Sequence, residues 1–182
     1  MRVIAGALKG RRLTTPKGRT TRPTADQVRI ACLDTLMPYL EAGPFLDLFA
    51  GAGGVGIEAL SRGAPSAVFV EEDRQAAAAL QDNIERFGLS DRARIHRQDV
   101  LRALEALARG GVRFAVVFLD PPYASPAATP ALERVARGDC LRPGAVVVAQ
   151  HPTKAPPPAE PDRKSTRLNS SHIQKSRMPS SA

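Results

Sequence analysis

The chain has 182 residues, of which 43% are hydrophobic, and its 26 Lys and Arg outnumber its 18 Asp and Glu. This length and composition are typical of a single globular domain with a sizeable core. No apolar run is long enough to span a bilayer, and two cysteines are too few for a disulfide framework, which argues against a membrane protein or a disulfide-stapled secreted protein. We expect a cytoplasmic chain with reduced thiols.

Basic charge gathers at the two ends of the chain. The first 36 residues carry eight Lys or Arg against two Asp, a net charge of +6, and residues 163–182 carry five Lys or Arg and no acid. In the first segment the basic residues are interleaved with aliphatic ones, which predicts a two-stranded hairpin that turns near Lys9. A basic arm beside a mildly acidic body is typical of proteins that bind polyanions, because phosphate contacts supply affinity. The alternative is a solvated charge run.

Residues 24–150 alternate between helical and strand patterns. A helix is predicted to begin at Thr24, where Gln27 completes a capping box, and further helices are predicted at 54–62, 73–87, 100–109 and from about 126. Short apolar runs predict strands at 44–49, 66–71, 93–98, 113–119 and 144–150. Such alternation makes right-handed crossovers, so the predicted fold class is α/β, with a Rossmann-like, doubly wound and mostly parallel sheet.

Three glycines follow the first of these strands. Gly51, Gly53 and Gly56 fit the spacing G-x-G-x-x-G, which is typical of nucleotide binding at the N-terminus of a helix. The next strand ends at Glu71, which could accept hydrogen bonds from ribose hydroxyls. A nicotinamide or flavin enzyme would show both features. Asp47 lies just before the glycines and favours a ligand with a cationic amino group over a pyrophosphate.

The tetrapeptide Asp120-Pro121-Pro122-Tyr123 follows the apolar run 114–119 and so lies at the carboxyl end of a strand, where open α/β sheets bind ligands. Two prolines stiffen the backbone. The turn offers a carboxylate, carbonyls without neighbouring N–H partners and the face of a ring, which together suit a flat group that bears an amine. The alternative is a tight turn with a surface tyrosine.

Together these motifs resemble the S-adenosylmethionine-dependent methyltransferases that modify exocyclic amino groups of nucleobases. The amino-terminal segments 2–6, 9–13 and 22–24, with Arg29, narrow this resemblance to one family of such methyltransferases. The chain is similar, from Met1 to about His151, to the RsmD-type 16S rRNA guanine-N2 methyltransferases. The resemblance implies S-adenosylmethionine as cofactor and 16S rRNA or an assembling small ribosomal subunit as substrate. It implies no metal and no membrane partner, and we expect a monomer.

The resemblance also assigns roles to individual residues. Asp120 and the carbonyl of Pro121 would accept the hydrogens of the amine, and Tyr123 would stack on the base. The implied cofactor contacts are Asp47, Ala50, Gly51, Gly53, Glu71, Asp99 and Thr24. The implied RNA contacts are Arg2, Lys9, Arg11, Arg12 and Arg22. Two of these residues have structural alternatives, because Asp99 could be the N-cap of the following helix and Asp47 could cap the glycine loop.

Three rival functions remain. A DNA adenine-N6 methyltransferase would use the same kind of turn, usually with Asn in place of Asp120, and would carry a long target-recognition segment. A nicotinamide-dependent oxidoreductase explains the glycines but neither the Asp120 turn nor the basic arm. A non-catalytic RNA-binding protein would result if the truncation expected at the chain end abolished folding or cofactor affinity.

The sequence predicts an arm at 1–23, a methyltransferase domain at 24–151 and a disordered tail at 152–182. We expect the domain to fold without residues 1–13. The tail is rich in Pro, Ser, Arg and Lys and shows no periodicity. The family resemblance implies two further strands there, which this sequence is not expected to supply, and residues 162–172 resemble translated sequencing-adapter read-through. The strand at 144–150 would then be an exposed edge.

Overall fold

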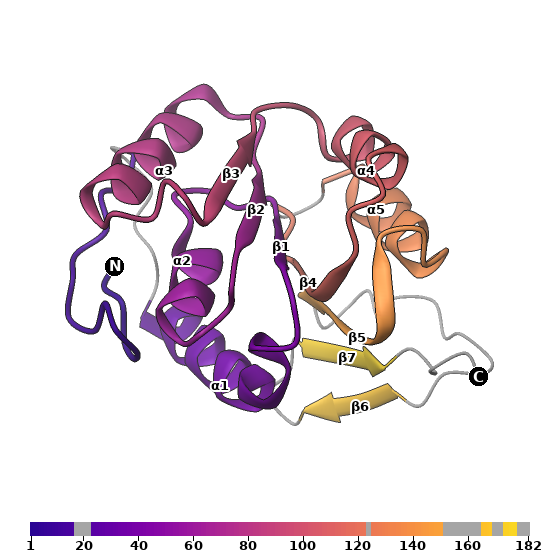
Figure 1. The fold of residues 1–182 in the computed structure, drawn as a ribbon, viewed down its shortest axis with the longest axis horizontal. Helices are drawn as coiled ribbons and strands as arrows, with labels where there is room; N and C mark the ends of the chain where they lie inside the picture. The colour runs from indigo at the N-terminus through magenta and orange to yellow at the C-terminus, as the bar shows by residue number, and fades with distance from the viewer. Residues whose placement is uncertain (17–22, 123–124, 151–164, 169–172, 178–182) are drawn as a thin grey trace.

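The structure is a computed structural model that describes residues 1–16, 23–122, 125–150, 165–168 and 173–177, with the backbone alone for 23–30 and for the segments after 150. It contains one seven-stranded sheet of order β3-β2-β1-β4-β5-β7-β6 (Figure 1). The strands are β1 (Phe45–Leu48), β2 (Ala67–Val70), β3 (Ala93–His96), β4 (Phe114–Leu119), β5 (Leu141–Gln150), β6 (Ser165–Leu168) and β7 (Ile173–Arg177). The helices are α1 (Pro23–Leu40), α2 (Gly54–Ser61), α3 (Arg74–Arg86), α4 (Val100–Arg109) and α5 (Ala128–Ala136).

Strands β1 to β5 are parallel, and helices cover both faces of the sheet (Figure 1). The predicted doubly wound α/β fold is therefore confirmed. The sheet has its topological switch point between β1 and β4, because the chain runs from β1 outward to β2 and β3 and then returns to β4 on the other side. Among the described residues, no helix is long and apolar enough to cross a membrane.

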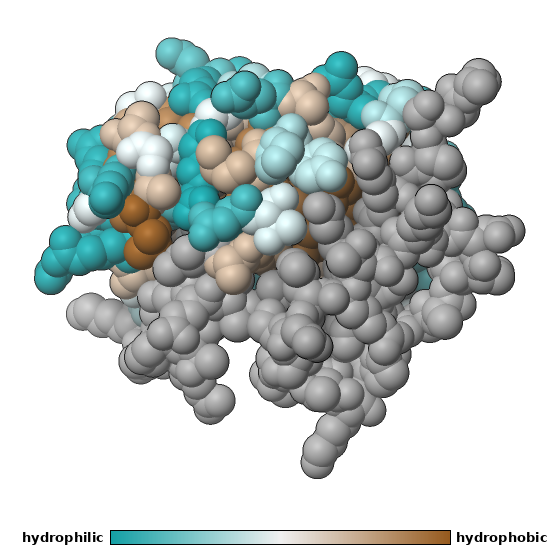
Figure 2. Space-filling view, turned by 90° about the horizontal axis from the view of Figure 1, so that it is seen from below, coloured by the Kyte–Doolittle hydropathy of each residue, from teal (hydrophilic) through white to brown (hydrophobic). Residues whose placement is uncertain are grey.

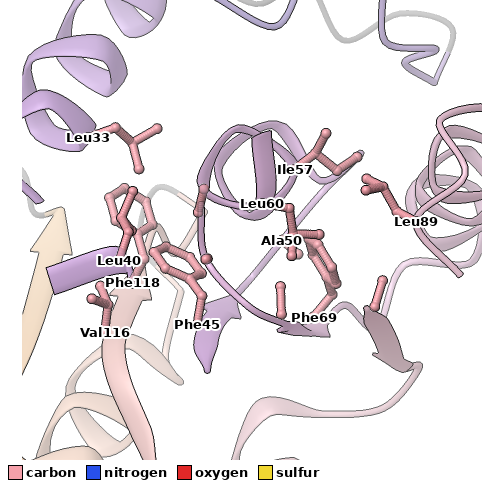
Figure 3. Close-up of a cluster of buried hydrophobic side chains, with 14 of the residues drawn as sticks. Leu33, Leu40, Phe45, Ala50, Ile57, Leu60, Phe69, Leu89, Val116 and Phe118 are labelled. Carbon is pink, nitrogen blue, oxygen red and sulfur yellow. The ribbon is translucent and has the colours of Figure 1, made fainter. Parts of the chain in front are cut away.

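Two apolar clusters lie on the two faces of the sheet. Because neighbouring side chains of a strand point to opposite faces, Phe118 joins the cluster beneath α1, α2 and α3, whereas Leu119 joins the cluster beneath α4 and α5. Figure 3 shows the first cluster, in which Phe45 and Phe118 lie close together. Burial on both faces explains why the strands are continuous apolar runs rather than alternating ones.

The chain end differs from the sequence prediction. Strand β7 pairs antiparallel with β5, with Val146 opposite Arg177, and β6 pairs antiparallel with β7. The prediction that the chain supplies no strands after residue 150 is therefore wrong, and β5 is not a sheet edge. The reason is that a ladder is made by backbone N–H and C=O groups, so a polar segment without apolar periodicity can still extend a sheet at its edge.

The amino-terminal arm is shorter in regular structure than predicted. In place of two strands it forms a single antiparallel bridge between Arg2 and Arg12. Gly6 adopts φ 78° and lies so close to α2 that a Cβ there would be 1.9 Å from the Ser61 carbonyl oxygen. Val3 and Leu13 belong to the first apolar cluster. The arm is thus packed into the body.

A buried carboxylate fastens the arm to α2. Glu58, only 1% exposed, accepts hydrogen bonds from Ile4 N (2.8 Å) and Ala5 N (2.9 Å), and from Arg62 Nε at 2.9 Å. Arg62 also forms an ion pair with Asp34. Desolvation would lower the pKa of Arg62, but its bonds to Asp34 and Glu58 outweigh this effect and raise that pKa. Removal of residues 1–13 would leave Glu58 without these amides and would take Val3 and Leu13 out of the first apolar cluster. These contacts argue against the expectation that the domain folds without the arm, which stays a prediction.

We expect Glu58→Ala to lower the free energy of unfolding by about 3 kcal/mol, because the buried Arg62 guanidinium and the amides of Ile4 and Ala5 would lose their acceptor. Urea unfolding followed by circular dichroism would measure the change. Glu105→Ala is the matched control, since Glu105 pairs with Arg134 at 3.1 Å on the surface and its removal should cost below about 1 kcal/mol. Equal losses in the two variants would show that Glu58 does not hold the arm.

Candidate active site

The predicted motifs meet at the switch point. Leu48 of β1 is paired with Leu119 of β4, so the glycine loop that follows β1 lies beside the turn that begins at Asp120. The backbone N–H of Asp120 donates to the carbonyl of Leu48 at 3.4 Å. Open α/β sheets bind ligands in the crevice between such loops.

The glycine loop has an unusual backbone. Phe49 adopts φ 62°, which is rare for a bulky residue, and its ring packs against the second apolar cluster. Gly51 has φ 57°, and a Cβ placed there would meet nothing within 4 Å. A Cβ at Gly53 would lie 2.4 Å from Leu80 Cδ1, and one at Gly56 would lie 2.3 Å from Phe69 Cε1. Gly51 therefore faces open space, while the other two glycines permit close packing.

Asp47 lies beneath this loop. It is 1% exposed, and its Oδ2 accepts a hydrogen bond from Gly56 N at 2.8 Å. Gly53, the N-cap of α2, provides no side-chain cap. The carboxylate from β1 thus caps the first turn of the helix, which is the structural alternative foreseen for Asp47. A contact between Asp47 and a cofactor stays a prediction.

The carboxylates of Glu71 and Asp99 also accept hydrogen bonds from backbone N–H groups. Glu71 Oε2 accepts from Gly51 N at 2.6 Å, and Oε1 accepts from Asp73 N at 2.8 Å. Asp99 is the N-cap of α4, and its Oδ1 accepts from Leu101 N (3.0 Å) and Arg102 N (3.1 Å). The structure therefore bears out the N-cap alternative for Asp99. Each Glu71 oxygen keeps a second lone pair, and Asp99 Oδ2 receives no hydrogen bond within the described part of the chain, so both residues can accept from a ligand.

The turn after β4 contains the candidate substrate groups. The Asp120 side chain reaches the surface, but the surrounding protein displaces enough water that desolvation raises the pKa of this carboxyl to about 6. Within the described residues the Pro121 carbonyl has no hydrogen-bond donor. The Pro122 carbonyl accepts a hydrogen bond from Ser125 N at 3.0 Å. Of the carbonyls of the two prolines, which were predicted to be unpaired, that of Pro122 is therefore already engaged. Tyr123 lies outside the described residues.

The predicted RNA contacts lie on the arm. Arg2, Lys9, Arg11 and Arg12 are exposed, on the side where Figure 1 places the arm beside α3. Arg22 and the side chain of Thr24 lie outside the described part of the structure. No group of three or more His, Cys, Asp or Glu that could hold a metal ion occurs among the described residues.

Sequence reasoning missed Asn83. This residue is 0% exposed and lies on the apolar face of α3. Its Nδ2 donates to the carbonyls of Thr14 (2.9 Å) and Ala52 (3.0 Å), and its Oδ1 accepts from Thr14 N at 2.7 Å. One amide thereby joins the end of the arm to the glycine loop. The sequence contained one sign of this role. Asn83 is a polar residue at a position that helical spacing places on the same face as the apolar residues Ala76, Leu80 and Ile84.

Comparison with known proteins agrees with this geometry. The model of the family described as "Conserved hypothetical protein 95" matches residues 1–173. The chain belongs to this family. It is 40% identical over 151 residues to YlbH of Bacillus subtilis, a proposed rRNA methyltransferase, covering 83% of this chain and 82% of the relative. It is 35% identical over 151 residues to the ribosomal RNA small subunit methyltransferase D of Haemophilus influenzae, covering 82% and 78%.

A solved structure shows the same likeness in three dimensions. The proposed methyltransferase yhhF from Escherichia coli superposes with a TM-score of 0.84 at 25% sequence identity, covering 100% of this chain and 99% of the other. The fold and the family membership inferred from the sequence motifs are therefore confirmed. The roles of the individual site residues remain predictions. The structure shows the hydrogen-bond partners of Asp47, Glu71 and Asp99 within the chain.

We expect Asn83→Asp to loosen the glycine loop and the arm together. The new carboxylate oxygen would face the carbonyls of Thr14 and Ala52 without a proton to donate, at a cost of about 1–3 kcal/mol. Native-state amide hydrogen exchange should accelerate both at residues 50–53 and at 13–14, while α5 keeps its protection. Gln75→Glu, the same change of amide to carboxylate at an exposed position in the first turn of α3, should change neither segment. Faster exchange at only one of the two segments would contradict the role of Asn83 as their common link.

Proposed function

We propose that the protein transfers a methyl group from S-adenosylmethionine to the exocyclic N2 amine of a guanine in 16S rRNA. It would act in the cytoplasm as a monomer, on 16S rRNA or on an assembling small subunit. The observation that carries the proposal is the juxtaposition of two motifs across the switch point. The glycine loop after β1 and the Asp120 turn after β4 are held together by the pairing of Leu48 with Leu119. The family of rRNA methyltransferases to which the chain belongs supports this assignment.

The residues of the first loop fit the proposed cofactor. The open space at Gly51 leaves room for a ligand against the backbone, and Glu71 and Asp99 keep acceptor positions for hydroxyl and amino hydrogens. S-adenosylmethionine supplies a methyl group on a sulfonium centre. The chain's own task at this loop is to bind and orient that group.

Asp47 argues against a pyrophosphate at the same loop. Its carboxylate already occupies the Gly56 amide in the first turn of α2, and it places a negative charge beneath the helix N-terminus. A dinucleotide would need such amides for its phosphates and would be repelled by this charge. The geometry therefore favours a cofactor without a pyrophosphate at the loop, although for a different reason from that given by the sequence, since Asp47 is buried rather than facing the ligand.

The turn after β4 suits an aromatic amine. The lone pair of such an amine is delocalised, so it must be oriented toward the methyl group and its hydrogens must be held. Two acceptors are available, the Asp120 carboxylate and the Pro121 carbonyl, and an N2 amine offers two hydrogens. A carboxylate beside the nitrogen favours the positive charge that develops there during transfer. Tyr123 would stack on the base.

The direct test is incubation of the protein with S-adenosylmethionine and unmodified 16S rRNA, followed by nucleoside analysis by mass spectrometry. The proposal predicts N2-methylguanosine. N6-methyladenosine as the product would favour an adenine methyltransferase, and the absence of any methylated nucleoside, with cofactor and RNA both bound, would favour a non-catalytic RNA-binding protein.

We expect the pH dependence of methylation to report the Asp120 carboxyl. The ionised form accepts the amine hydrogens, so kcat/KM should fall as the pH drops through about 6, rather than through the lower range of an ordinary Asp. Asp120→Asn should lower kcat and remove this inflection, while S-adenosylmethionine affinity stays within a few-fold. Loss of cofactor affinity in that variant would instead make the turn a structural element of the cofactor site.

We expect Gly51→Val to weaken S-adenosylmethionine binding by at least about tenfold, because its side chain fills the open space at the loop. Gly111→Val is the matched control. Gly111 also has positive φ (70°) and open space around its Cβ position, but it follows α4 away from the loop. Both variants carry the same backbone strain, so calorimetry should show a loss for Gly51→Val alone. Equal affinity in the two folded variants would contradict the assignment of the loop.

A further inference from the structure

Arg2 and Arg12 form a pair of like charges on the arm. They lie opposite each other in the antiparallel bridge. The neighbours of the pair, rather than its members, make the backbone hydrogen bonds, of which Val3 N to Arg11 O (3.0 Å) is one. This arrangement is the non-hydrogen-bonded kind of pair, in which opposite side chains are closest, and like charges there are destabilising. Both side chains are exposed, and Arg2 Nη1 also donates to the Gly10 carbonyl at 3.2 Å, so an anion that approaches this pair would meet two cations.

A second pair of like charges joins the arm to α3. The guanidinium carbons of Arg11 and Arg86 lie 4.8 Å and 5.8 Å from the ring centroid of Phe87. Arg11 comes from the arm, whereas Arg86 is the last residue of α3. A guanidinium held against an aromatic ring keeps N–H groups at its rim, oriented and available for a phosphate.

Arg86 is held in place by two further contacts. Its Nη1 donates to Thr14 Oγ1 at 2.6 Å and lies 3.3 Å from Asp82 Oδ2. The other nearby acid of α3, Glu85, accepts a hydrogen bond from Gln81 at 2.7 Å and so is engaged elsewhere on the helix. Asp82 thus contacts Arg86. Arg86 belongs to a group of exposed cations, which we call the basic surface: Arg2, Lys9, Arg11, Arg12 and Arg86. Figure 2 shows many hydrophilic side chains, with some apolar ones among them, along the left-hand edge of the molecule, the side on which Figure 1 places the arm.

We propose that the basic surface is one continuous binding surface for the phosphate backbone of RNA, in which Arg86 of α3 contacts phosphate together with the arm. The inference deepens the proposed function, on which its choice of RNA rests. The Arg2 and Arg12 pair gains when a phosphate approaches it, and Arg11 and Arg86 each present N–H groups beside the Phe87 ring, where hydrogen bonds to phosphate would be charge-assisted. Because Asn83 joins Thr14 to Ala52, RNA held by Arg11 and Arg86 has a fixed relation to the glycine loop.

The test is the salt dependence of RNA binding by Arg86→Gln. Fluorescence anisotropy with a labelled RNA hairpin, without cofactor, gives the affinity over a series of KCl concentrations. Loss of one phosphate contact should weaken binding several-fold at low salt and flatten the logarithmic salt slope by about 0.7–0.9. The matched control is Arg134→Gln, because Arg134 also pairs with an exposed acid, Glu105 at 3.1 Å, but on α5. The control should keep the affinity and the slope of the wild type.

Arg11→Gln provides a second measurement of the same pair and should flatten the slope by a similar amount, so the outcome does not depend on one variant. Wild-type affinity and slope in a folded Arg86→Gln or Arg11→Gln variant would overturn the proposal and leave the pair as a fastening between the arm and α3. Binding to anionic lipid vesicles with no binding to RNA would also overturn it. Asp120→Ala separates this inference from the proposed function, since it should lose methyl transfer but retain the salt slope.

Discussion

The position of α2 depends on two buried carboxylates. Asp47 reaches from β1 to the Gly56 amide in the first turn of the helix, and Glu58 extends from the helix to the amides of Ile4 and Ala5. A buried carboxylate is costly unless hydrogen bonds satisfy its oxygens. Here backbone N–H groups satisfy both carboxylates, so each can be satisfied only while the loop, the helix and the arm stay in their relative places. The glycine loop is shaped by this constraint.

The arm and the cofactor loop are consequently parts of one structure. Glu58 attaches the arm to α2, and Asn83 attaches the end of the arm, through Thr14, to the loop carbonyl of Ala52. The residues proposed to bind RNA and those proposed to bind the cofactor therefore share buried anchors. An enzyme that must bring a methyl donor and a base within reacting distance gains from such rigidity, because small displacements of either group reduce the rate strongly.

Local pattern in the sequence predicted the order of helices and strands, the glycine loop and the place of the Asp120 turn, since these follow from hydrophobic periodicity and from turn chemistry. The polar residues buried by tertiary packing could not be predicted in this way. Glu58 and Asn83 find their partners 54 and 69 residues away along the chain. Asp47 looked like a ligand because only the fold shows the Gly56 amide above it. Strands β6 and β7 escaped prediction because backbone pairing, and not apolar pattern, defines them.

The proposed function depends most on the binding of S-adenosylmethionine beside the glycine loop and the Asp120 turn. Calorimetric titration of the full chain with S-adenosylmethionine and, separately, with NAD tests this binding directly, because both ligands suit the glycine spacing and only the second carries a pyrophosphate. The structure predicts saturable binding of S-adenosylmethionine at one site per chain and no binding heat with NAD. Saturable binding of NAD without binding of S-adenosylmethionine would contradict it.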